Sequence, residues 1–474
     1  MKTLALALVS AAALSAPAFA AEAPLRPDQT EFRALYKELV ETNTTLSSGS
    51  CTLAAERMGA RLAAAGIPAS QITYFSTPDH PREGGIVVVY PGTSKTLKPM
   101  LLLAHLDVVE AKREDWTRDP FTMVEEGGYF YARGVADDKF MAATWTDTLV
   151  RFAKQKYRPA RTVKMALTCG EETTFAFNGA QWLAQNRRDL IDAAFALNEG
   201  GGGMTDGKGV VDGGRVVLQT MQVGEKAVQN FRIETTNPGG HSSTPVPDNA
   251  IYELAGALVK LHHFEFPVEM YDTTRAFFAQ GGKARGGAMG AAMQAIAANP
   301  GDKQAEALLN TDRGFHSILR TTCVATLLDG GHANNALPQR AGANINCRIF
   351  PGHGSEEIRQ QLEKAIADPG VKVTMTPPVR PIAKPPALDP AIMGPVTKLA
   401  ARYFPGVPVV PAMSTGATDG IFLEAVGIPT YGVPADWSNP DGNGVHGLNE
   451  RLETRAVYTG RDYLFDLVKE LASK

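Results

Sequence analysis

The pattern of apolar and polar positions predicts alternating strands and helices over the first two hundred residues. Short apolar runs of the kind that buried strands show lie at 85–90, 100–105, 163–168 and 193–198. A helix is predicted over 139–154, because Met141, Trp145 and Leu149 fall on one stripe. Further helical regions are predicted at 30–66 and 180–185. This rhythm is typical of an α/β unit with a mixed or parallel central sheet and helices on both faces.

From about Val223 the pattern changes to strand, helix, strand, strand, helix, strand, which is the ferredoxin-like order. The six segments are 226–235, 249–261, 321–328, 343–350, 355–366 and 371–375. Residues 271–319, rich in Ala, Gly and Met, interrupt this order and predict a flexible helical insertion. The α/β pattern then resumes, so the smaller unit is inserted into the larger one.

The start of the chain has the three parts of an export signal. Lys2 is followed by an apolar segment at 4–13 and by Ala18-Phe19-Ala20, a typical cleavage site. No later apolar run reaches the ~18 residues that a membrane-spanning helix needs. We therefore expect a secreted or periplasmic protein without stable membrane insertion. Its parts are a signal peptide at 1–20, catalytic segments at 21–222 and 377–474, and an inserted unit at 223–376.

The net charge bears on binding partners, and the cysteines bear on disulfide formation. A net charge of −3 on 474 residues provides no basic surface, so nucleic acid is not an expected partner. Cys169 is interpreted as a small buried residue. Cys323 and Cys347 lie at equal distances from Asn335, and a symmetric hairpin would place them opposite each other. A disulfide between them and two free buried thiols are both compatible with the sequence.

Two imidazoles and several carboxylates stand at predicted strand ends or in glycine-rich loops. They are His105, Asp137, Glu172, Glu199 and His446. Nitrogen and oxygen ligands without thiolates suit one or two Zn²⁺ ions and also accept Co²⁺ or Mn²⁺. Asp137 could bridge two cations through its two oxygens, while Asp138 could cap the helix that follows.

Two further carboxylates fit supporting roles in metal-assisted hydrolysis. Asp107 lies two residues after His105 and could accept the second N–H of a metal-bound imidazole. Glu171 and Glu172 are neighbours on an extended chain and point in opposite directions. We assign Glu172 to the metal and Glu171 to the attacking water, as the general base that later protonates the leaving amine.

The ordered motifs HLDVV, GVADDK, CGEE, NEGG and VHGLNE resemble those of the di-zinc aminoacylase, carboxypeptidase and desuccinylase family of metallopeptidases (clan MH). This family includes carboxypeptidase G-like enzymes, acetylornithine deacetylase and succinyl-diaminopimelate desuccinylase. The resemblance runs from about residue 30 onward. It implies an α/β zinc-hydrolase domain with an inserted ferredoxin-like lid that often dimerises. It also implies two Zn²⁺ per subunit, one on His105, Asp137 and Glu199, the other on Asp137, Glu172 and His446.

The resemblance extends to residues that contact the substrate. The segment NPGGHSSTPVPDNA resembles a lid motif whose histidine, here His241, stabilises the oxyanion, often across a dimer interface. Without the resemblance, His241 would be interpreted as a turn residue. Asn335 and Arg348 resemble lid positions that grip the substrate backbone or carboxylate, although an ion pair at a domain edge suits Arg348 equally. The catalytic-domain loop near the same carboxylate contains Gly416, Thr418 and Asp419.

The sequence thus predicts an exported zinc-dependent hydrolase that cleaves a peptide bond beside a free carboxylate through a metal-activated water. We expect a carboxypeptidase or dipeptidase acting on small peptides. The alternative is an N-acyl-amino-acid amidohydrolase, and the third hypothesis is a non-catalytic periplasmic ligand-binding protein. Two departures from the family pattern leave the substrate open. Phe140 replaces a glycine, and the 271–319 insertion could shape the cleft.

Overall fold

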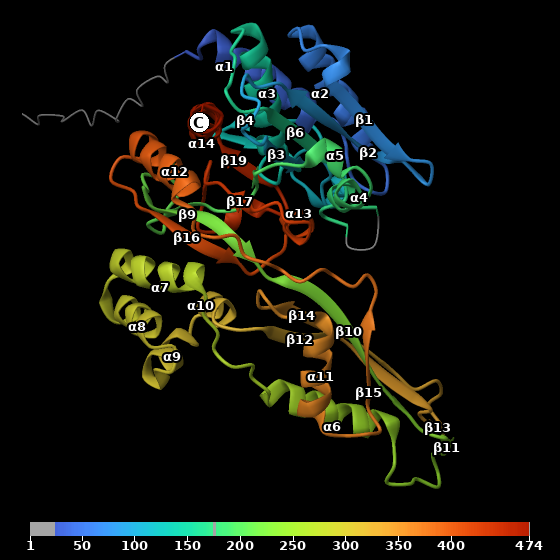
Figure 1. The fold of residues 1–474 in the computed structure, drawn as a ribbon. Coiled ribbons are helices and arrows are strands. Elements are labelled where there is room, and N and C mark those ends of the chain that lie inside the picture. Colours follow the sequence, from blue (N-terminus) through green and yellow to red (C-terminus); the bar gives the residue numbers. More distant parts are fainter. Residues whose placement is uncertain (1–23, 174–176, 474) are drawn as a thin grey trace, which may run out of the picture.

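The computed structural model describes residues 24–173 and 177–473, so the expected signal peptide at 1–20 lies outside the described residues. Two units are visible in Figure 1. The larger is built on a ten-stranded sheet and the smaller on a four-stranded one. The chain passes between them where β9 leads into β10 and returns through residues 377–389. None of the described helices is long and apolar enough to cross a membrane.

The large sheet is mixed, as the sequence predicts. Its order is β1 (Ile72–Thr77), β2 (His80–Tyr90), β6 (Val163–Thr168), β3 (Met100–His105), β7 (Phe195–Asn198), β17 (Thr430–Gly432), β9 (Val216–Glu225), β8 (Gly202–Thr205) and β18 (Trp437–Ser438), with β16 (Val409–Ser414) beside β9. β3 pairs in parallel with both β6 and β7, whereas β2 runs antiparallel to β6. The strands β3, β6 and β7 therefore end at the same edge.

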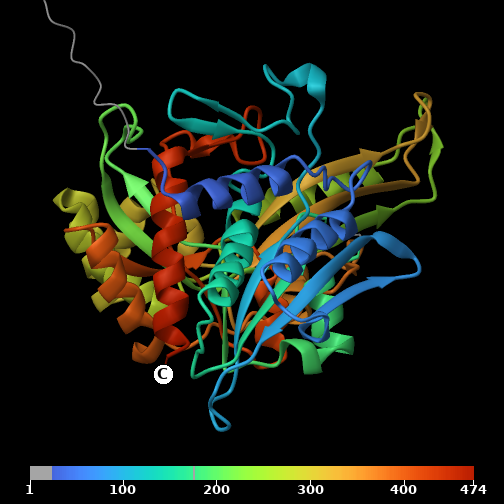
Figure 2. The same cartoon turned by 90° about the horizontal axis from the view of Figure 1, so that it is seen from above.

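Both faces of this sheet are covered, which explains the continuous apolar run of β3. Leu102 and Ala104 point into one core, and Leu101 and Leu103 point into the other. The first core is shared with α1 (Pro27–Val40), α2 (Cys51–Ala64), α3 (Lys139–Lys154), α12 (Pro390–Tyr403) and α14 (Thr454–Leu471), some of which lie over the near face of the sheet in Figure 2. The second contains residues of α4 (Gly179–Asn186), α5 (Arg188–Ile191) and α13 (Gly420–Ala425).

One predicted helical region is two helices. Residues 30–66 are divided between α1 and α2, because residues 41–50 form a turn-rich connection. The side chain of Ser50 caps α2 by accepting the backbone N–H of Leu53. Apolar spacing alone does not reveal such an interruption, since both helices face the same core.

The small unit has the strand order β12 (Thr322–Gly330), β14 (Arg340–Ile349), β10 (Ala227–Thr236) and β15 (Lys372–Thr376), all antiparallel. Helices α6 (Ala250–His263) and α11 (Ser355–Ile366) connect these strands in the ferredoxin-like order. The short strands β11 (Gly240–His241) and β13 (Ala336–Leu337) pair at the tip farthest from the large sheet (Figure 1). A separate three-stranded sheet contains β4 (Val124–Glu126), β5 (Tyr129–Tyr131) and β19 (Arg451–Glu453).

The insertion at 271–319 is a packed group of helices. It contains α7 (Asp272–Arg285), α8 (Gly287–Ala298), α9 (Lys303–Leu309) and α10 (Arg313–Ile318). Phe278, Met293 and Leu309 form an apolar cluster that includes Val410 of β16. The expected flexibility is therefore not what the structure shows, because this cluster anchors the helices on one end of the large sheet.

Two disulfides connect the four cysteines. Cys323 and Cys347 lie directly opposite each other on β12 and β14 and are bonded, as the symmetric hairpin allowed. The interpretation of Cys169 as an isolated buried residue is wrong, because Cys169 is bonded to Cys51 at the start of α2. That partner is 118 residues away, and the packing of α2 on β2, which pairs with β6, brings the two together.

Loss of the longer-range disulfide should destabilise the protein more. By the chain-entropy relation, replacing Cys51 and Cys169 with alanine should lower the free energy of unfolding by about 5 kcal/mol. The same change at Cys323 and Cys347 should cost about 3 kcal/mol, because the closed loop is shorter. Urea unfolding of the two double variants measures both values. Equal losses would contradict the chain-entropy account.

Candidate metal centre and active site

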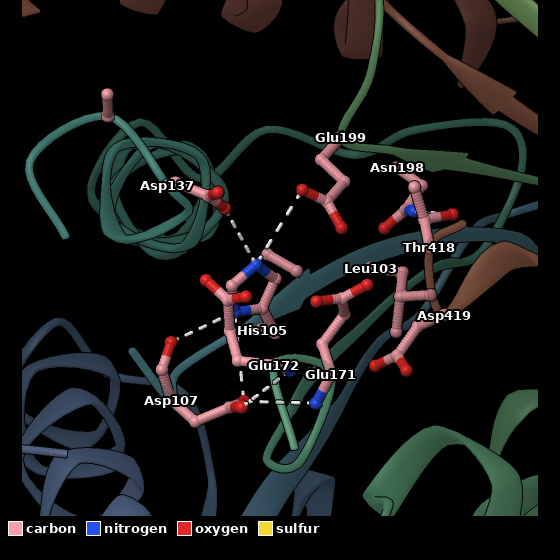
Figure 3. A network of polar contacts seen from close by, with 12 residues as sticks. Leu103, His105, Asp107, Asp137, Glu171, Glu172, Asn198, Glu199, Thr418 and Asp419 are labelled. Atoms are coloured by element: carbon pink, nitrogen blue, oxygen red, sulfur yellow. Dashed lines mark hydrogen bonds and ion pairs between the residues drawn. The ribbon is translucent and has the colours of Figure 1, made fainter. Parts of the chain in front are cut away.

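The candidate ligands meet where parallel strands of the large sheet end. His105 is the last residue of β3, Glu172 follows β6 and Glu199 follows β7. Asp137 precedes α3, and His446 precedes β19. The carboxyl ends of parallel strands are the usual location of sites in open α/β sheets, and here several loops converge on one point (Figure 3).

Asp137 lies between the two histidines. Its Oδ1 is 3.0 Å from His105 Nε2, and its Oδ2 is 3.1 Å from His446 Nε2. Glu199 Oε2 is 3.6 Å from His105 Nε2, and Glu172 Oε1 is 2.9 Å from His446 Nε2. Two ligand groups therefore share one carboxylate, and the ligand atoms of each group lie within 4.8 Å of one another. This is the pattern that two cations bridged by one aspartate require.

The charges of the site favour bound cations. Burial and then the charge of Glu199 raise the pKa values of Asp138 and Glu171 well above their usual range. Hydrogen bonds with Asp137 and Glu172 raise the pKa of His446 to about 10. So many buried carboxylates are stable only beside compensating positive charge, and imidazole and carboxylate donors suit a divalent metal. The residues thus fit the expected metal.

Glu171 lies close to both ligand groups. Its carboxylate extends toward Glu199 in Figure 3, while Glu172 turns toward His446. One oxygen each of Glu171 and Glu172 also lies within 4.8 Å of a ring nitrogen of His105. Glu171 is therefore placed where a base beside the metal ligands has to be.

The carboxylate of Asp107 was expected to accept the second N–H of His105, but its main contacts are backbone N–H groups. The nearest partner of His105 Nδ1 is the backbone oxygen of Asp107 at 3.0 Å, while the carboxylate is 3.7 Å away. The Asp107 carboxylate instead accepts the backbone N–H groups of Gly170, Glu171 and Glu172 at 2.7, 3.3 and 3.0 Å. Asp107 therefore fixes both the tautomer of His105, through its backbone, and the loop that carries the two glutamates.

A buried ion pair that the sequence reasoning missed joins the two remaining ligand loops. Glu450 accepts hydrogen bonds from the backbone N–H groups of Gly134, Ala136 and Asp137, and forms an ion pair with Arg133 at 2.8 Å. Arg133 also donates to the backbone oxygen of Gly447. These contacts fix Asp137 relative to His446. The motif spacing showed that Glu450 follows His446 closely, but not that it turns back to the Asp137 loop.

Phe140, the departure from the family pattern, lies in the core beneath the site. Its ring packs edge-on against Tyr36 of α1 at 6.3 Å between centroids. Asp138 occupies the expected N-cap position of α3, but its side chain makes no capping hydrogen bond. The larger side chain at position 140 is therefore accommodated by α1 and does not displace the ligand loop.

A pocket of about 230 Å³ opens beside Glu171. It is lined by both glutamates, His446, Arg348 of β14, and Thr418 and Asp419 of the loop before α13. Arg380, which the sequence reasoning did not single out, also lines this pocket. Among the described lining residues none comes from 271–319, so the helical insertion does not form this wall.

The loop at 416–419 is held by a second buried glutamate that was missed. Glu225, the last residue of β9, accepts the backbone N–H and the hydroxyl of Thr418 at 3.0 and 2.7 Å. Burial raises the pKa of Glu225 to about 8. Gly416 lies at the start of the same loop and donates its N–H to the hydroxyl of Ser414. The sequence contained one sign of this role, because Glu225 is a charged residue at the end of a largely apolar strand.

Two predicted substrate residues are not near this pocket. His241 is exposed on β11, and Asn335 accepts the N–H of Ser242 at the same tip. Figure 1 places this tip at the far end of the small sheet from the metal centre. The structure therefore places Arg348 and Thr418 in one pocket with Glu171 and Glu172, with Gly416 at the start of the Thr418 loop, and places His241 and Asn335 together at the tip.

Two ligand groups sharing a carboxylate, beside an adjacent base and a pocket, define a metal-dependent hydrolase. A sequence model of Peptidase family M20/M25/M40 matches residues 101–470. Human N-fatty-acyl-amino acid synthase/hydrolase PM20D1 is 28% identical over 391 residues, covering 80% of this chain and 75% of that protein. Aminoacylase-1B of Rattus norvegicus is 25% identical over 398 residues, covering 82% of this chain and 83% of that protein.

Solved structures agree on the fold. The M20 metallo-carboxypeptidase Sso-CP2 of Sulfolobus solfataricus superposes with a TM-score of 0.68 at 17% identity, covering 94% of this chain and 100% of that one. YXEP of Bacillus subtilis, a dinuclear metal binding peptidase, gives 0.56 at 14% identity, covering 94% and 98%. The chain belongs to the M20/M25/M40 peptidase family. It is a metal-dependent enzyme of the peptidase and amidohydrolase class, which confirms the family expected from the motifs.

Removal of the shared ligand should release more metal than removal of a ligand to one group. Asp137→Ala should therefore retain less zinc per chain than His446→Ala after dialysis, because Asp137 belongs to both groups and His446 to one. Elemental analysis measures the zinc content. Glu31→Gln, an exposed change on α1, serves as the control. Equal zinc loss in the two ligand variants would contradict a bridging Asp137.

Proposed function

We propose that this protein is an exported di-zinc exopeptidase that cleaves a peptide bond beside a free carboxylate, acting as a carboxypeptidase or dipeptidase. The observation that carries the proposal is the position of Glu171, which lies between the Asp137-bridged ligand groups and the pocket that contains Arg348. The export signal comes from the sequence pattern at 1–20.

His105, Asp137 and Glu199 would hold one zinc, and Asp137, Glu172 and His446 the other. When bound, zinc lowers the pKa of a coordinated water toward ~7 and polarises the scissile carbonyl. Co²⁺ or Mn²⁺ could occupy the same donors. Glu171 takes a proton from the attacking water and then delivers it to the leaving amine nitrogen. Asp107 holds Glu171 in place, because it binds the backbone N–H of that residue.

Arg348 supplies the charge for the free carboxylate of the substrate. A guanidinium matches a carboxylate with two parallel hydrogen bonds, and Arg348 faces the same pocket as the base. Thr418, in the loop that begins at Gly416, also lines the pocket and is held by Glu225. An exopeptidase needs a charge anchor and a base in the same pocket, because the anchor selects the terminal peptide bond for the base.

An N-acyl-amino-acid amidohydrolase is the second candidate. It is favoured by the sequence similarity to the human N-fatty-acyl-amino acid synthase/hydrolase and to the rat aminoacylase. Both reactions place a free carboxylate beside the scissile amide, so Arg348 serves either. A non-catalytic periplasmic binding protein would have no use for Glu171.

We propose further that His241 acts in a second copy of the chain. It lies too far along the small unit to join the metal centre of its own chain (Figure 1). The small unit also exposes an apolar face on the edge strand β12 and helix α6. Its members and their exposed fractions are Val324 61%, Leu327 69%, Leu328 69%, Tyr252 70% and Val259 57%. A face of this kind suits a symmetric dimer that carries His241 to the partner's site.

Replacement of the base tests the catalytic proposal. Glu171→Gln should lower kcat by roughly 10² to 10⁴-fold, because proton transfer is lost. The zinc content should stay near that of the wild type. Release of free amino acids from dipeptides and from N-acyl amino acids, measured side by side, separates the peptidase from the acylase. No turnover of either class by the zinc-loaded wild type would favour the binding protein.

A mixing experiment tests the dimer. His241→Ala and Glu171→Gln should each be inactive when purified separately. Co-expressed with different tags, they should regain about a quarter of wild-type activity in the unfractionated mixture and about half in the purified mixed dimer, because one of the two sites of each mixed dimer is intact. Purification through both tags isolates the mixed dimer. Activity no higher than that of the separate variants would show that His241 does not act across an interface.

A further inference from the structure

Two arginines face the pocket beside Glu171. Arg348 comes from strand β14 of the small unit, and Arg380 comes from the segment at 377–389 that returns to the large unit. The proposed hydrolysis needs one arginine, which anchors the free carboxylate of the substrate. Arg380 is left without a role.

Neither guanidinium has a side-chain hydrogen bond or ion pair among the residues that the structure describes. Across residues 24–173 and 177–473, no side chain forms an ion pair or hydrogen bond with the guanidinium of Arg348 or Arg380. Some other arginines of the small unit do have carboxylate partners, since Arg232 binds Asp329 and Arg320 binds Glu306.

Asp419 does not form an ion pair with Arg380. Asp419 lines the same pocket, but its Oδ1 accepts from Asn178 at 2.6 Å and its Oδ2 accepts from Thr168 at 3.0 Å. Both oxygens thus have neutral donors. Burial lowers the pKa values of Arg348 and Arg380, which means that their surroundings do not yet balance the charge. A partly desolvated guanidinium without a counter-charge is costly, so the natural partner is an anionic ligand.

The two arginines have different surroundings. Arg380 lies over the ring of Phe422, with its guanidinium carbon 5.4 Å from the ring centroid, and the charges of Asp419 and Glu171 act on it. Arg348 is on strand β14, where its charge acts on Lys226. The two guanidiniums therefore have different neighbours, and we treat them as two separate anchors.

We propose that Arg380 binds a second carboxylate, so that the preferred residue on the carboxyl side of the scissile bond is aspartate or glutamate. This rests on the proposed hydrolysis and adds its substrate class. The α-carboxylate of that residue is bound by Arg348, and its side-chain carboxylate by Arg380. Two anionic groups of the substrate would supply the direct partners that both guanidiniums lack among the described residues.

Matched substrate pairs test this assignment. Alanyl-glutamate and alanyl-glutamine, and likewise N-acetyl-glutamate and N-acetyl-glutamine, differ only in the charge of the side chain. The wild type should show a kcat/KM roughly 10- to 100-fold higher for the glutamate member, the range expected for a charge-assisted hydrogen bond. Arg380→Gln should bring that ratio close to one, and Arg380→Lys should restore part of it.

Two controls distinguish this role from others. Arg348→Gln should lower kcat/KM for both members of a pair by similar factors, because both carry the α-carboxylate. Arg232→Gln, at a surface ion pair away from the pocket, should leave the ratio unchanged. In calorimetry, Glu171→Gln should bind alanyl-glutamate more tightly than alanyl-glutamine. This difference in affinity should disappear in the double variant that also carries Arg380→Gln.

The outcomes separate this inference from the proposed function. Hydrolysis of both members of a pair at equal rates by the wild type would overturn the role of Arg380 and leave the hydrolase proposal intact. Equal losses for both members in Arg380→Gln would also overturn it, since Arg380 would then serve the α-carboxylate. If neither member is cleaved by the zinc-loaded enzyme, the proposed function itself fails, while calorimetry still tests Arg380.

Discussion

Mutual repulsion among the buried carboxylates around His105 is the constraint on which the rest of this structure depends. Glu171, Glu172 and Glu199 follow strand ends, Asp137 precedes α3, and these part-buried acids repel one another unless positive charge or N–H donors compensate them. The supporting residues can be understood as responses to this repulsion. Asp107 is compensated by three backbone N–H groups, and Glu450 by Arg133 and the Asp137 loop. The candidate ligands Asp137, Glu172 and Glu199 place their carboxylates beside the two histidines, which suits them to cations.

The sequence predicted those parts of the fold that local pattern determines. The bounds of β3, β6 and α3 coincide with the predicted segments, because strands buried on both faces and a helix with one apolar stripe leave clear patterns. The candidate metal ligands could be singled out because each stands beside a strand end or a glycine, and the structure brings them together. Cys51, Glu225, Glu450 and Arg380 were missed because their roles come from distant partners. Arg380 also lies in a proline-rich segment that has no periodicity.

The motif resemblance suggested a role for His241, but only the fold shows the geometrical problem that this role raises. The ribbon of β11 and β13 carries His241 away from the large sheet, so that a residue assigned to catalysis lies outside the site of its own chain. Sequence motifs do not specify which copy of a chain a residue serves. The small unit nevertheless takes part in the local site, since its strand β14 supplies Arg348 to the pocket. It therefore has two functional ends, one beside the metal centre and one at the tip.

The ion pair between Arg133 and Glu450 affects the stage of synthesis at which the site can form. Its partners are 317 residues apart, and breaking a buried pair of this kind by removing one partner typically costs 3–5 kcal/mol. Ribosomes synthesise His105, Asp137, Glu172 and Glu199 long before His446 and Glu450. A nascent or truncated chain thus holds most of the acids but neither the last ligand nor the ion pair that fixes the Asp137 loop. The complete group of candidate ligands therefore forms only when the end of the chain has folded back onto the Asp137 loop.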